Sequence, residues 1–428
     1  MKFTLLWASL FWPIFATAEE LVSQVFLEKL VQEAQDNNPD IQAARQRWES
    51  GQAVIPQVQT LPDPKVILGY KDMAPQKEMM YGMSQEIPFP GKLGLKGEIA
   101  TRDAERMEQD YLATRLAVVA RLKEAFYDLH FVHDSIEVLG KTKLLLEEFE
   151  ETARVRYSVG QAAQQDVLRA QTEISRLLAR LASLNQRRQT LHADINRLLN
   201  RLPNDTLAPP QDKSAGSGFA REAPEGGQAG TAWPEIRFTP LRHTPAELNA
   251  LLDQSSPLLH GQQKTLERGD QNIALAKREY YPDFELDARG LRDTAMKTDG
   301  YQVMLNVKVP LYFATKQREG VHEAVAGREA SFQDLQALRQ ELLARIRDNL
   351  AQTERAEMLV NLLKDAIIPQ SRLTLASAQA SYAVGKVDFL TLLNSLLTLQ
   401  ENELEFHSEL AEHEKALARL EGITGETP

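Results

Sequence analysis

Two pairs of histidines are the side chains whose types and spacing come nearest to metal chemistry. His130 and His133 stand three positions apart, so they would share one face of a helix, and His407 and His413 form a looser pair. A protein zinc site uses three or four ligands at characteristic spacings, and nothing near either pair completes such a set. The sequence therefore predicts packed or solvated histidines, no metal site and no cofactor.

Phosphate-binding and catalytic motifs are missing as well. Gly140-Lys141-Thr142 matches the end of a phosphate-binding loop, but that loop needs a further glycine where this chain has Ser135. Neither Gly-x-Ser-x-Gly nor His-Glu-x-x-His occurs. We therefore expect no catalytic residues and no enzyme activity.

The composition excludes two further classes. The chain has no cysteine, which removes disulfides, thiol chemistry and a lipid anchor on an N-terminal cysteine. Its formal charge is −11, from 49 basic and 60 acidic residues, and this balance argues against nucleic acid as a partner. Stability must therefore come from packing and assembly.

Residues 1–18 have the layout of a secretory signal peptide. Lys2 precedes an apolar run from Phe3 to Phe15, and small residues then precede Glu19. The run is shorter than the roughly 20 apolar residues of a membrane-spanning helix, and no comparable run follows. We expect a mature chain from Glu19 that can cross a membrane only with β-strands.

An internal duplication organises the rest of the chain. Landmarks that recur in the same order, at nearly the same separation, indicate a structural repeat. The number of positions between the two copies of a landmark changes by only a few from the first pair to the last. Four landmarks recur in this way: Asn37-Asn38-Pro39 as Ser255-Ser256-Pro257, Leu61-Pro62-Asp63 as Tyr281-Pro282-Asp283, Ile87-Pro88-Phe89 as Val309-Pro310-Leu311, and Tyr157-Ser158-Val159-Gly160 as Tyr382-Ala383-Val384-Gly385.

Each half is predicted to run helix, two strands, long helix, Val-Gly turn and long helix. Between the halves, paired prolines and glycines give a composition that does not sustain a packed core, which indicates a linker. The predicted units after the signal peptide are a first repeat (19–202, strands at about 64–74 and 78–88), a linker (203–243) and a second repeat (244–424, strands at about 282–292 and 300–312).

Two segments of the second repeat alternate between apolar and polar side chains, as a strand with two unlike faces does. Such strands suit lipid on one side and a polar lumen on the other, but four strands cannot close a barrel around water. Either several chains contribute four strands each, or the hairpins pack as a small sheet on a soluble helical body. The apolar positions are Phe284, Leu286, Ala288, Gly290, Tyr301, Val303, Leu305, Val307 and Val309.

The helical segments are too long for a compact globule. Residues 93–156 contain no proline and would extend about 95 Å as a helix, whereas helices of globular proteins average about 11–12 residues. The segments 164–202, 315–381 and 388–421 repeat the arrangement, with apolar residues at three- and four-residue spacings. We expect coiled-coil packing faces without chemistry of their own.

Two glycine turns reverse these long helices. Gly160 and Gly385 can adopt the left-handed conformation that ends a helix, and Asp166 and Asp388 lie near the starts of the returning helices. We expect the tips, far from the strands, to present a docking surface for another helical hairpin. The side chains that form this surface are Tyr157, Val159, Tyr382 and Val384.

The duplicated helix-hairpin-helix plan, the two Tyr-x-Val-Gly tips and the segment Glu86 to Lys92 resemble the TolC family of outer-membrane efflux proteins, over nearly all of the mature chain. The resemblance implies a mainly α fold with a transmembrane β-barrel. A homotrimer in the outer membrane of a Gram-negative bacterium would form twelve strands, four per chain, continued by an α-helical coiled-coil tunnel in the periplasm. It also implies coupling to an inner-membrane pump of the RND type through a periplasmic adaptor protein.

Two details of the resemblance concern substrate and gate. Pro88 to Lys92 resembles the branch that serves heavy-metal cation pumps, although strand and helix ends explain it locally. In the family, side chains beyond the second tip, often aspartates, narrow the periplasmic mouth. This chain departs from the acidic pattern, and a Leu390 plug with an Asn394 hydrogen-bonding ring is the predicted replacement. The matching gate positions are Asp388, Leu390, Thr391 and Asn394.

The predicted function is passive conduction of heavy-metal cations or small toxic compounds from pump and adaptor to the cell exterior. A soluble periplasmic coiled-coil scaffold and an outer-membrane conduit for secreted polypeptides remain alternatives. An apolar belt on the strands separates a barrel from a scaffold, because only a barrel needs lipid or detergent to cover it.

Overall fold

A computed structural model describes residues 18–73, 76–207, 236, 238–293 and 298–426. The predicted signal peptide and most of the predicted linker lie outside these residues. Among the helices described, none combines the length and the apolarity that crossing a membrane requires.

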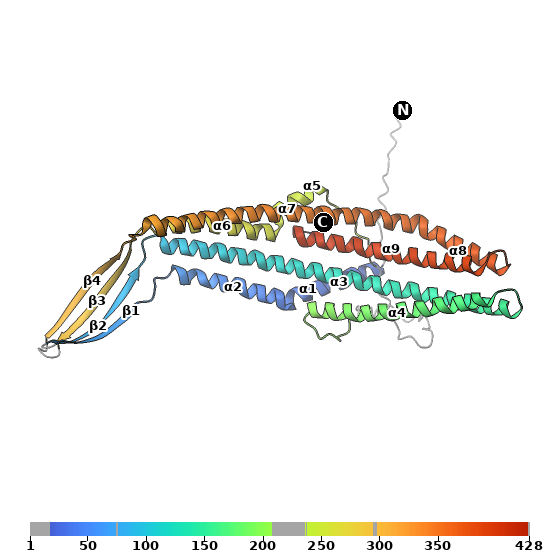
Figure 1. Cartoon of the computed structure of the whole chain (residues 1–428), viewed down its shortest axis with the longest axis horizontal. Coiled ribbons are helices and arrows are strands. Elements are labelled where there is room, and N and C mark those ends of the chain that lie inside the picture. Colours follow the sequence, from blue (N-terminus) through green and yellow to red (C-terminus); the bar gives the residue numbers. More distant parts are fainter. Residues whose placement is uncertain (1–17, 74–75, 208–235, 237, 294–297, 427–428) are drawn as a thin grey trace, which may run out of the picture.

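The described chain is a long rod with a four-stranded sheet at one end and two helical hairpin tips at the other (Figure 1). The first half consists of α1 (Ala18–Asn37), α2 (Pro39–Gln59), β1 (Lys65–Met73), β2 (Gln76–Ile87), α3 (Lys92–Ser158) and α4 (Gln164–Leu198). The second half consists of α5 (Pro245–Ser255), α6 (Pro257–Arg278), β3 (Asp283–Asp293), β4 (Thr298–Lys308), the π-turn η1 (Phe313–Gln317), α7 (Arg318–Leu362), the π-turn η2 (Leu363–Ile367), α8 (Ile368–Ala383) and α9 (Phe389–Thr424).

Both halves follow the predicted duplicated plan, and the mainly α fold class with four strands per chain is confirmed. Asn38 caps α2 and donates a 2.8 Å hydrogen bond to the carbonyl of Leu198, at the end of the returning helix α4. In the second half, a Cβ on Gly425 would lie 3.0 Å from the carbonyl of Ser255. In the first repeat, the break between α1 and α2 therefore lies against the end of the returning helix α4. In the second repeat, the break between α5 and α6 lies against the end of α9.

The sheet joins the two halves. Its order is β1-β2-β3-β4 with every neighbouring pair antiparallel, so the central β2–β3 pair links the first repeat to the second. Tyr81 lies opposite Gly290, where a Cβ would come within 2.6 Å of the tyrosine ring. The strands β1 and β4 form the two edges of the sheet within the chain.

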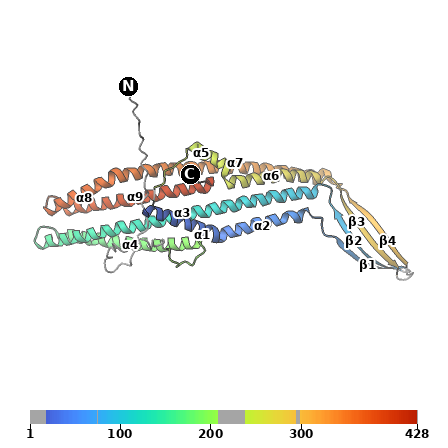
Figure 2. The same cartoon turned by 180° about the vertical axis from the view of Figure 1, so that it is seen from behind.

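Helices α2, α3, α6 and α7 lie side by side in a row next to the sheet, as the two opposite views show (Figures 1 and 2). Further along, α3 pairs with α4 and α8 pairs with α9, while α3 also packs on α9. Leucines at three- and four-residue spacing fill the cores between them, including Leu177 and Leu191 of α4. The predicted coiled-coil faces are therefore packing faces.

One predicted boundary in the second repeat is wrong. The strand predicted at 300–312 ends at Lys308, because Pro310 has no N–H to donate to a ladder. The segment 315–381 is helical throughout, but it begins within η1 and contains η2, where the backbone winds into π-turns that accommodate an extra residue.

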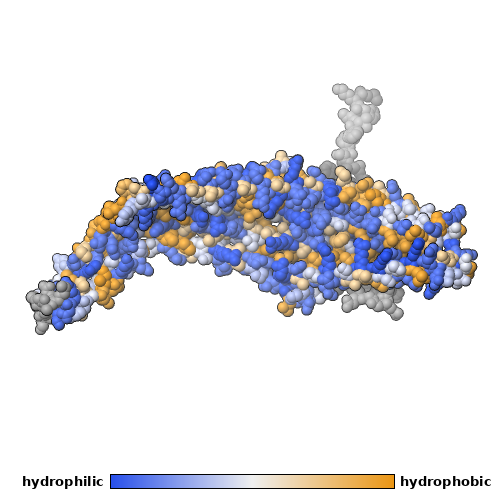
Figure 3. All heavy atoms as spheres, in the orientation of Figure 1, coloured by the Kyte–Doolittle hydropathy of each residue, from blue (hydrophilic) through white to orange (hydrophobic). Residues whose placement is uncertain are grey.

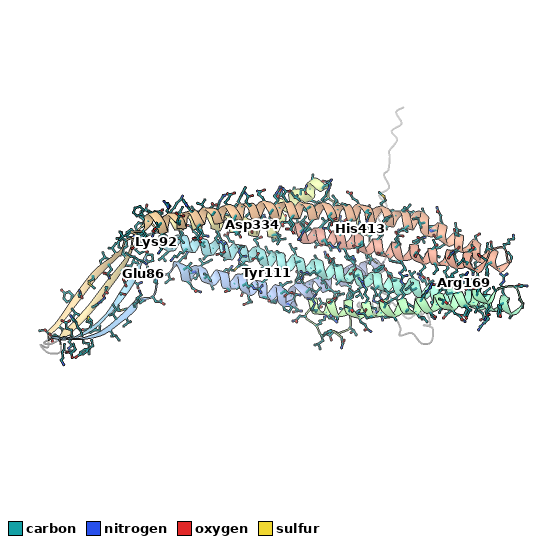
Figure 4. All side chains as sticks on the ribbon, in the orientation of Figure 1. Glu86, Lys92, Tyr111, Arg169, Asp334 and His413 are labelled. Atoms are coloured by element: carbon teal, nitrogen blue, oxygen red, sulfur yellow. The ribbon has the colours of Figure 1, made fainter. Side chains whose placement is uncertain are left out.

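A buried lysine fixes the junction of strands and helices. The Lys92 side chain is only 3% exposed, and its ammonium lies 2.8 Å from Asp283 of β3 and 3.4 Å from Glu279. Asp283 also accepts a 2.8 Å hydrogen bond from the Phe89 N–H, and the Phe89 ring stacks on Tyr281. Figure 4 labels Lys92 where the strands meet α3. The segment Pro88 to Lys92 thus connects the two repeats.

Replacing Lys92 tests this junction. We expect Lys92→Met to destabilise the protein by roughly 1–3 kcal/mol, because the partly buried carboxylate of Asp283 would lose its partner. Thermal unfolding in detergent measures the loss. The double variant Lys92→Met/Asp283→Leu should recover much of it, since an apolar pair replaces the ion pair. A single variant as stable as the parent would show that the ion pair contributes nothing.

Candidate functional site

One face of the sheet is apolar and exposed. Side chains of this face alternate along every strand, and exposure reaches 89% at Tyr301. Figure 3 shows hydrophobic residues along the sheet end of the rod. A surface this apolar needs a cover of lipid or protein. Its large exposed members are Val66, Leu68, Tyr70, Met79, Tyr81, Met83, Leu286, Tyr301, Val303, Leu305 and Val307.

The opposite face of the sheet is polar. Arg289 donates a 2.7 Å hydrogen bond to the carboxylate of Asp287, and the Ser84 hydroxyl donates a 3.0 Å bond to Glu285. A Cβ on Gly82 would collide with the backbone at Ala288 and Arg289, so the glycine allows β2 and β3 to approach closely at this point. The two faces together suit strands that separate lipid from an aqueous lumen.

The two hairpin tips have matching backbones. Gly160 and Gly385 both have left-handed φ angles, of 73° and 74°. Each glycine N–H donates a 3.0 Å bond to the carbonyl three residues before it, of Tyr157 and Tyr382 respectively. The predicted glycine conformation is therefore confirmed at both tips, and side chains other than glycine are strained there.

The tip side chains do not match. Tyr157, Val159 and Val384 are exposed, but Tyr382 is only 4% exposed and packs against Phe389. The expectation that Tyr382 is presented for docking is therefore wrong. Its ring is covered by Arg156 of the first tip, whose guanidinium lies 4.6 Å from the ring centroid and donates to the Tyr382 carbonyl. Tyr382 thus joins the two hairpins from inside.

The residues beyond the second tip take two roles. Asp388 caps α9 by accepting a 2.9 Å hydrogen bond from the Thr391 N–H. Hydrogen bonds from the Thr391 hydroxyl and N–H lower the pKa of Asp388, so its carboxylate is engaged locally. Leu390, Thr391 and Asn394 are exposed in the single chain. Leu390 and Asn394 stand four residues apart, so they share a helix face.

The histidines are dispersed among packing roles. His130 is buried beside Phe126, and the rings of His133 and His192 are 6.4 Å apart. His407 lies 3.0 Å from Asp134, whereas His413 stacks on Phe238. In the part of the chain that is described, no group of three or more His, Cys, Asp or Glu could hold a metal ion.

Sequence reasoning missed Arg156 and the role of Lys92. Both are single basic residues in helices rich in charge, and only their partners distinguish them. Only their positions in the sequence could have singled them out. Arg156 directly precedes the first tip, and Lys92 directly follows Pro90 and Gly91 at the start of α3.

A rod of long helices, a sheet with one lipid-compatible face and paired hairpin tips define a channel subunit. The chain belongs to the outer membrane efflux protein family, which matches residues 30–201 and 249–426. This membership places it in the outer membrane, with its helices extending into the periplasm.

The relatives cover nearly the whole chain. The cobalt-zinc-cadmium resistance protein CzcC of Cupriavidus metallidurans is 19% identical over 414 residues, which is 96% of this chain and 92% of CzcC. The outer membrane protein TolC of Vibrio cholerae is 23% identical over 418 residues, 91% of this chain and 89% of TolC. The structure of the outer-membrane channel OprN superimposes with a TM-score of 0.78 at 16% identity, over 95% and 91% of the two chains.

The buried histidine of α3 predicts a dependence of stability on pH. Burial lowers the pKa of His130 to about 4, below the value of about 6.5 in an unfolded chain. Between these values the unfolded chain binds the extra proton, so stability falls as the pH drops, by on the order of 3 kcal/mol across the window. We expect His130→Leu to lose this share of the dependence, measured by denaturant unfolding from pH 7 to pH 4, while His133 and His192, whose pKa values burial also lowers, keep their own share. Identical pH profiles for variant and parent would contradict the prediction.

Proposed function

We propose that three copies of this chain form a passive outer-membrane conduit, coupled to an inner-membrane RND-type pump through a periplasmic adaptor. The observation that carries the proposal is the sheet, which has one exposed apolar face and two edges without a partner among the described residues. Within lipid every backbone N–H and C=O must be paired, so the edges require further copies. Three copies would supply a closed barrel of twelve strands.

The size of the strands supports this proposal. They contain 9, 12, 11 and 11 residues, and a tilted transmembrane strand needs about 9–11. A soluble scaffold, the main alternative, would leave the apolar face of the sheet in water. Such contiguous exposure is unfavourable for a soluble protein, which makes the scaffold the weaker hypothesis.

The tips support the docking and gating part of the proposal. Tyr157, Val159 and Val384, with the turns at Gly160 and Gly385, form the surface for a helical hairpin of the adaptor. Widening of the periplasmic end would separate the groups that narrow it. We assign Leu390 as an apolar plug, and Thr391 and Asn394 as polar groups of the same constriction, held by the Asp388 cap.

Heavy-metal cations or small toxic compounds are the substrates we propose. The full-length match to the cobalt-zinc-cadmium resistance protein CzcC favours cations. The segment Pro88 to Lys92 adds nothing to this choice, because its lysine is buried in an ion pair. A polypeptide substrate is the alternative, and metal sensitivity of a deletion strain separates the two.

The conduit is tested first by the state of the protein in cells. We expect it in the outer-membrane fraction, and we expect detergent extracts to show a three-chain species on unheated gels and after amine cross-linking. Extraction should require detergent, since the apolar face of the sheet must be covered. A monodisperse periplasmic monomer that stays soluble without detergent would overturn the proposal.

The docking tip is tested at Gly385. Leucine at a φ of 74° is strained by about 1–2 kcal/mol, so Gly385→Leu should distort the turn and abolish adaptor pull-down and efflux complementation. The three-chain species should persist, because the tip lies far from the sheet. Gly385→Asn is the matched control, since asparagine tolerates the left-handed region and should retain docking. Full complementation by Gly385→Leu would count against the tip.

A further inference from the structure

A proline changes the winding of the helix between α7 and α8. Pro369 has no N–H to donate, and a proline ring inside a helix crowds the carbonyl four residues before it, here that of Asp365. Asp365 lies in η2, where the backbone forms a π-turn instead of continuing the α-helix. Single π-turns inside long helices are frequent at functional sites. The surroundings of η2 are therefore a place to look for a ligand.

A hollow of about 250 Å³ lies beside η2. Its lining comes from α3, η2, α8 and α9, and in both views α9 runs between α3 and α8 (Figures 1 and 2). The hollow therefore spans the two hairpins of one chain. Its residues in α3, Val138 and Lys141, belong to the half of that helix nearer the tip, so the hollow is remote from the sheet.

The floor of the hollow is apolar. Val138 and Ile368 are buried, and Phe406 is partly buried against the same core. These three side chains come from α3, α8 and α9. A floor of this kind favours a ligand that carries hydrocarbon, because covering it removes apolar surface from water.

The rim of the hollow is basic, although the chain as a whole has a formal charge of −11. Lys141, Lys364 and Arg372 line it, against a single carboxylate, Glu403. Arg372 pairs with Glu403 at 2.7 Å. Lys141 pairs with Glu137 at 2.7 Å, but both of these side chains are mostly exposed, so solvent screens their attraction.

Lys364 carries the charge that is not matched. Among the residues that the structure describes, no carboxylate forms an ion pair with its ammonium. Lys364 and Arg372 stand four residues before and four residues after Ile368, and all three line the hollow. His407 also lines it but lies 3.0 Å from Asp134, which does not. A cation without a partner therefore stands next to an apolar floor.

We propose that the hollow binds a small amphipathic anion, with an acidic head group on a short hydrocarbon chain. The head group pairs with Lys364, and the hydrocarbon covers Val138, Ile368 and Phe406. The volume is below the roughly 300–1,000 Å³ of most ligand pockets, which limits the length of the chain. The distance from the sheet makes the periplasmic solution the source of the ligand, rather than the membrane. The site is complete in one chain and does not depend on the proposed conduit.

An occupant of this site contacts both hairpins, since α3 belongs to the first and α8 and α9 belong to the second. A ligand that binds only the folded protein raises its stability by mass action. Binding should therefore be visible both as saturable heat and as a higher midpoint of thermal unfolding.

Octanoate is the probe, because it combines a carboxylate with a short hydrocarbon chain. We expect isothermal titration of the detergent-solubilised protein to show saturable binding, after subtraction of a titration into detergent alone. Octyltrimethylammonium has a similar chain and the opposite charge, and acetate has the head group without the chain. Neither should give saturable heat. Octanoate that fails to saturate, or a cation that binds as tightly as octanoate, would overturn the anion site.

Charge reversal at Lys364 locates the binding. This side chain is exposed and makes no ion pair among the described residues, so Lys364→Glu should unfold at the midpoint of the parent. Octanoate binding should weaken by about tenfold or more, because a charged hydrogen bond is lost and a like charge is added. Lys364→Gln, which removes the charge without reversing it, should weaken binding by a smaller factor.

Lys316→Glu is the matched control. Lys316 is an exposed lysine in the other π-turn, η1, at the sheet end of α7, and this variant should bind octanoate as the parent does. Equal binding by the parent and Lys364→Glu would show that octanoate enters the detergent or another surface, and would overturn the proposal. Saturable, Lys364-dependent binding by a protein that is a monomer in detergent would leave this site standing and overturn the conduit alone.

Discussion

The pairing of backbone polar groups along the sheet is the constraint on which the rest of the structure depends. Four strands leave β1 and β4 with unpaired edges, and the apolar face of the sheet suits a medium that offers no water to those edges. One chain cannot satisfy both requirements. The duplication supplies two hairpins per chain, and assembly has to supply the rest.

The junction at Lys92 connects the helices to this sheet, so the pairing of the strands also fixes where the helices begin. The strands end where the Lys92–Asp283 ion pair and the Phe89–Tyr281 stack bind the two repeats together. Beyond this junction the second repeat is slightly longer than the first, since matching landmarks are 222 positions apart at Ile87 and Val309 but 225 apart at Tyr157 and Tyr382. The π-turns η1 and η2 lie between these landmarks in the second repeat, so they can absorb extra residues without turning the packing faces away from the core.

Much of this architecture could be predicted because it is periodic or duplicated in sequence. Alternation in β3 and β4, helix length, and Gly160 and Gly385 each follow from local rules. The two Tyr-x-Val-Gly tips show where such rules stop. Tyr157 and Tyr382 occupy the same motif, yet one is 46% exposed and the other 4%. The difference comes partly from Phe389, which follows Tyr382 across the turn and packs against its ring, and partly from Arg156, a contact across the fold that no local spacing encodes.

Any widening of the tunnel end has to act either between the two hairpins of one chain or between chains. Inside a chain, the hairpins share one apolar core that includes Phe149, Leu177, Tyr382 and Phe389, and Arg156 ties the tips together. Exposing one large side chain from such a core costs about 1.5–3 kcal/mol. The shared core and the Arg156–Tyr382 contact therefore make each chain's pair of hairpins move as a unit, so in the proposed conduit any widening falls at the boundaries between copies.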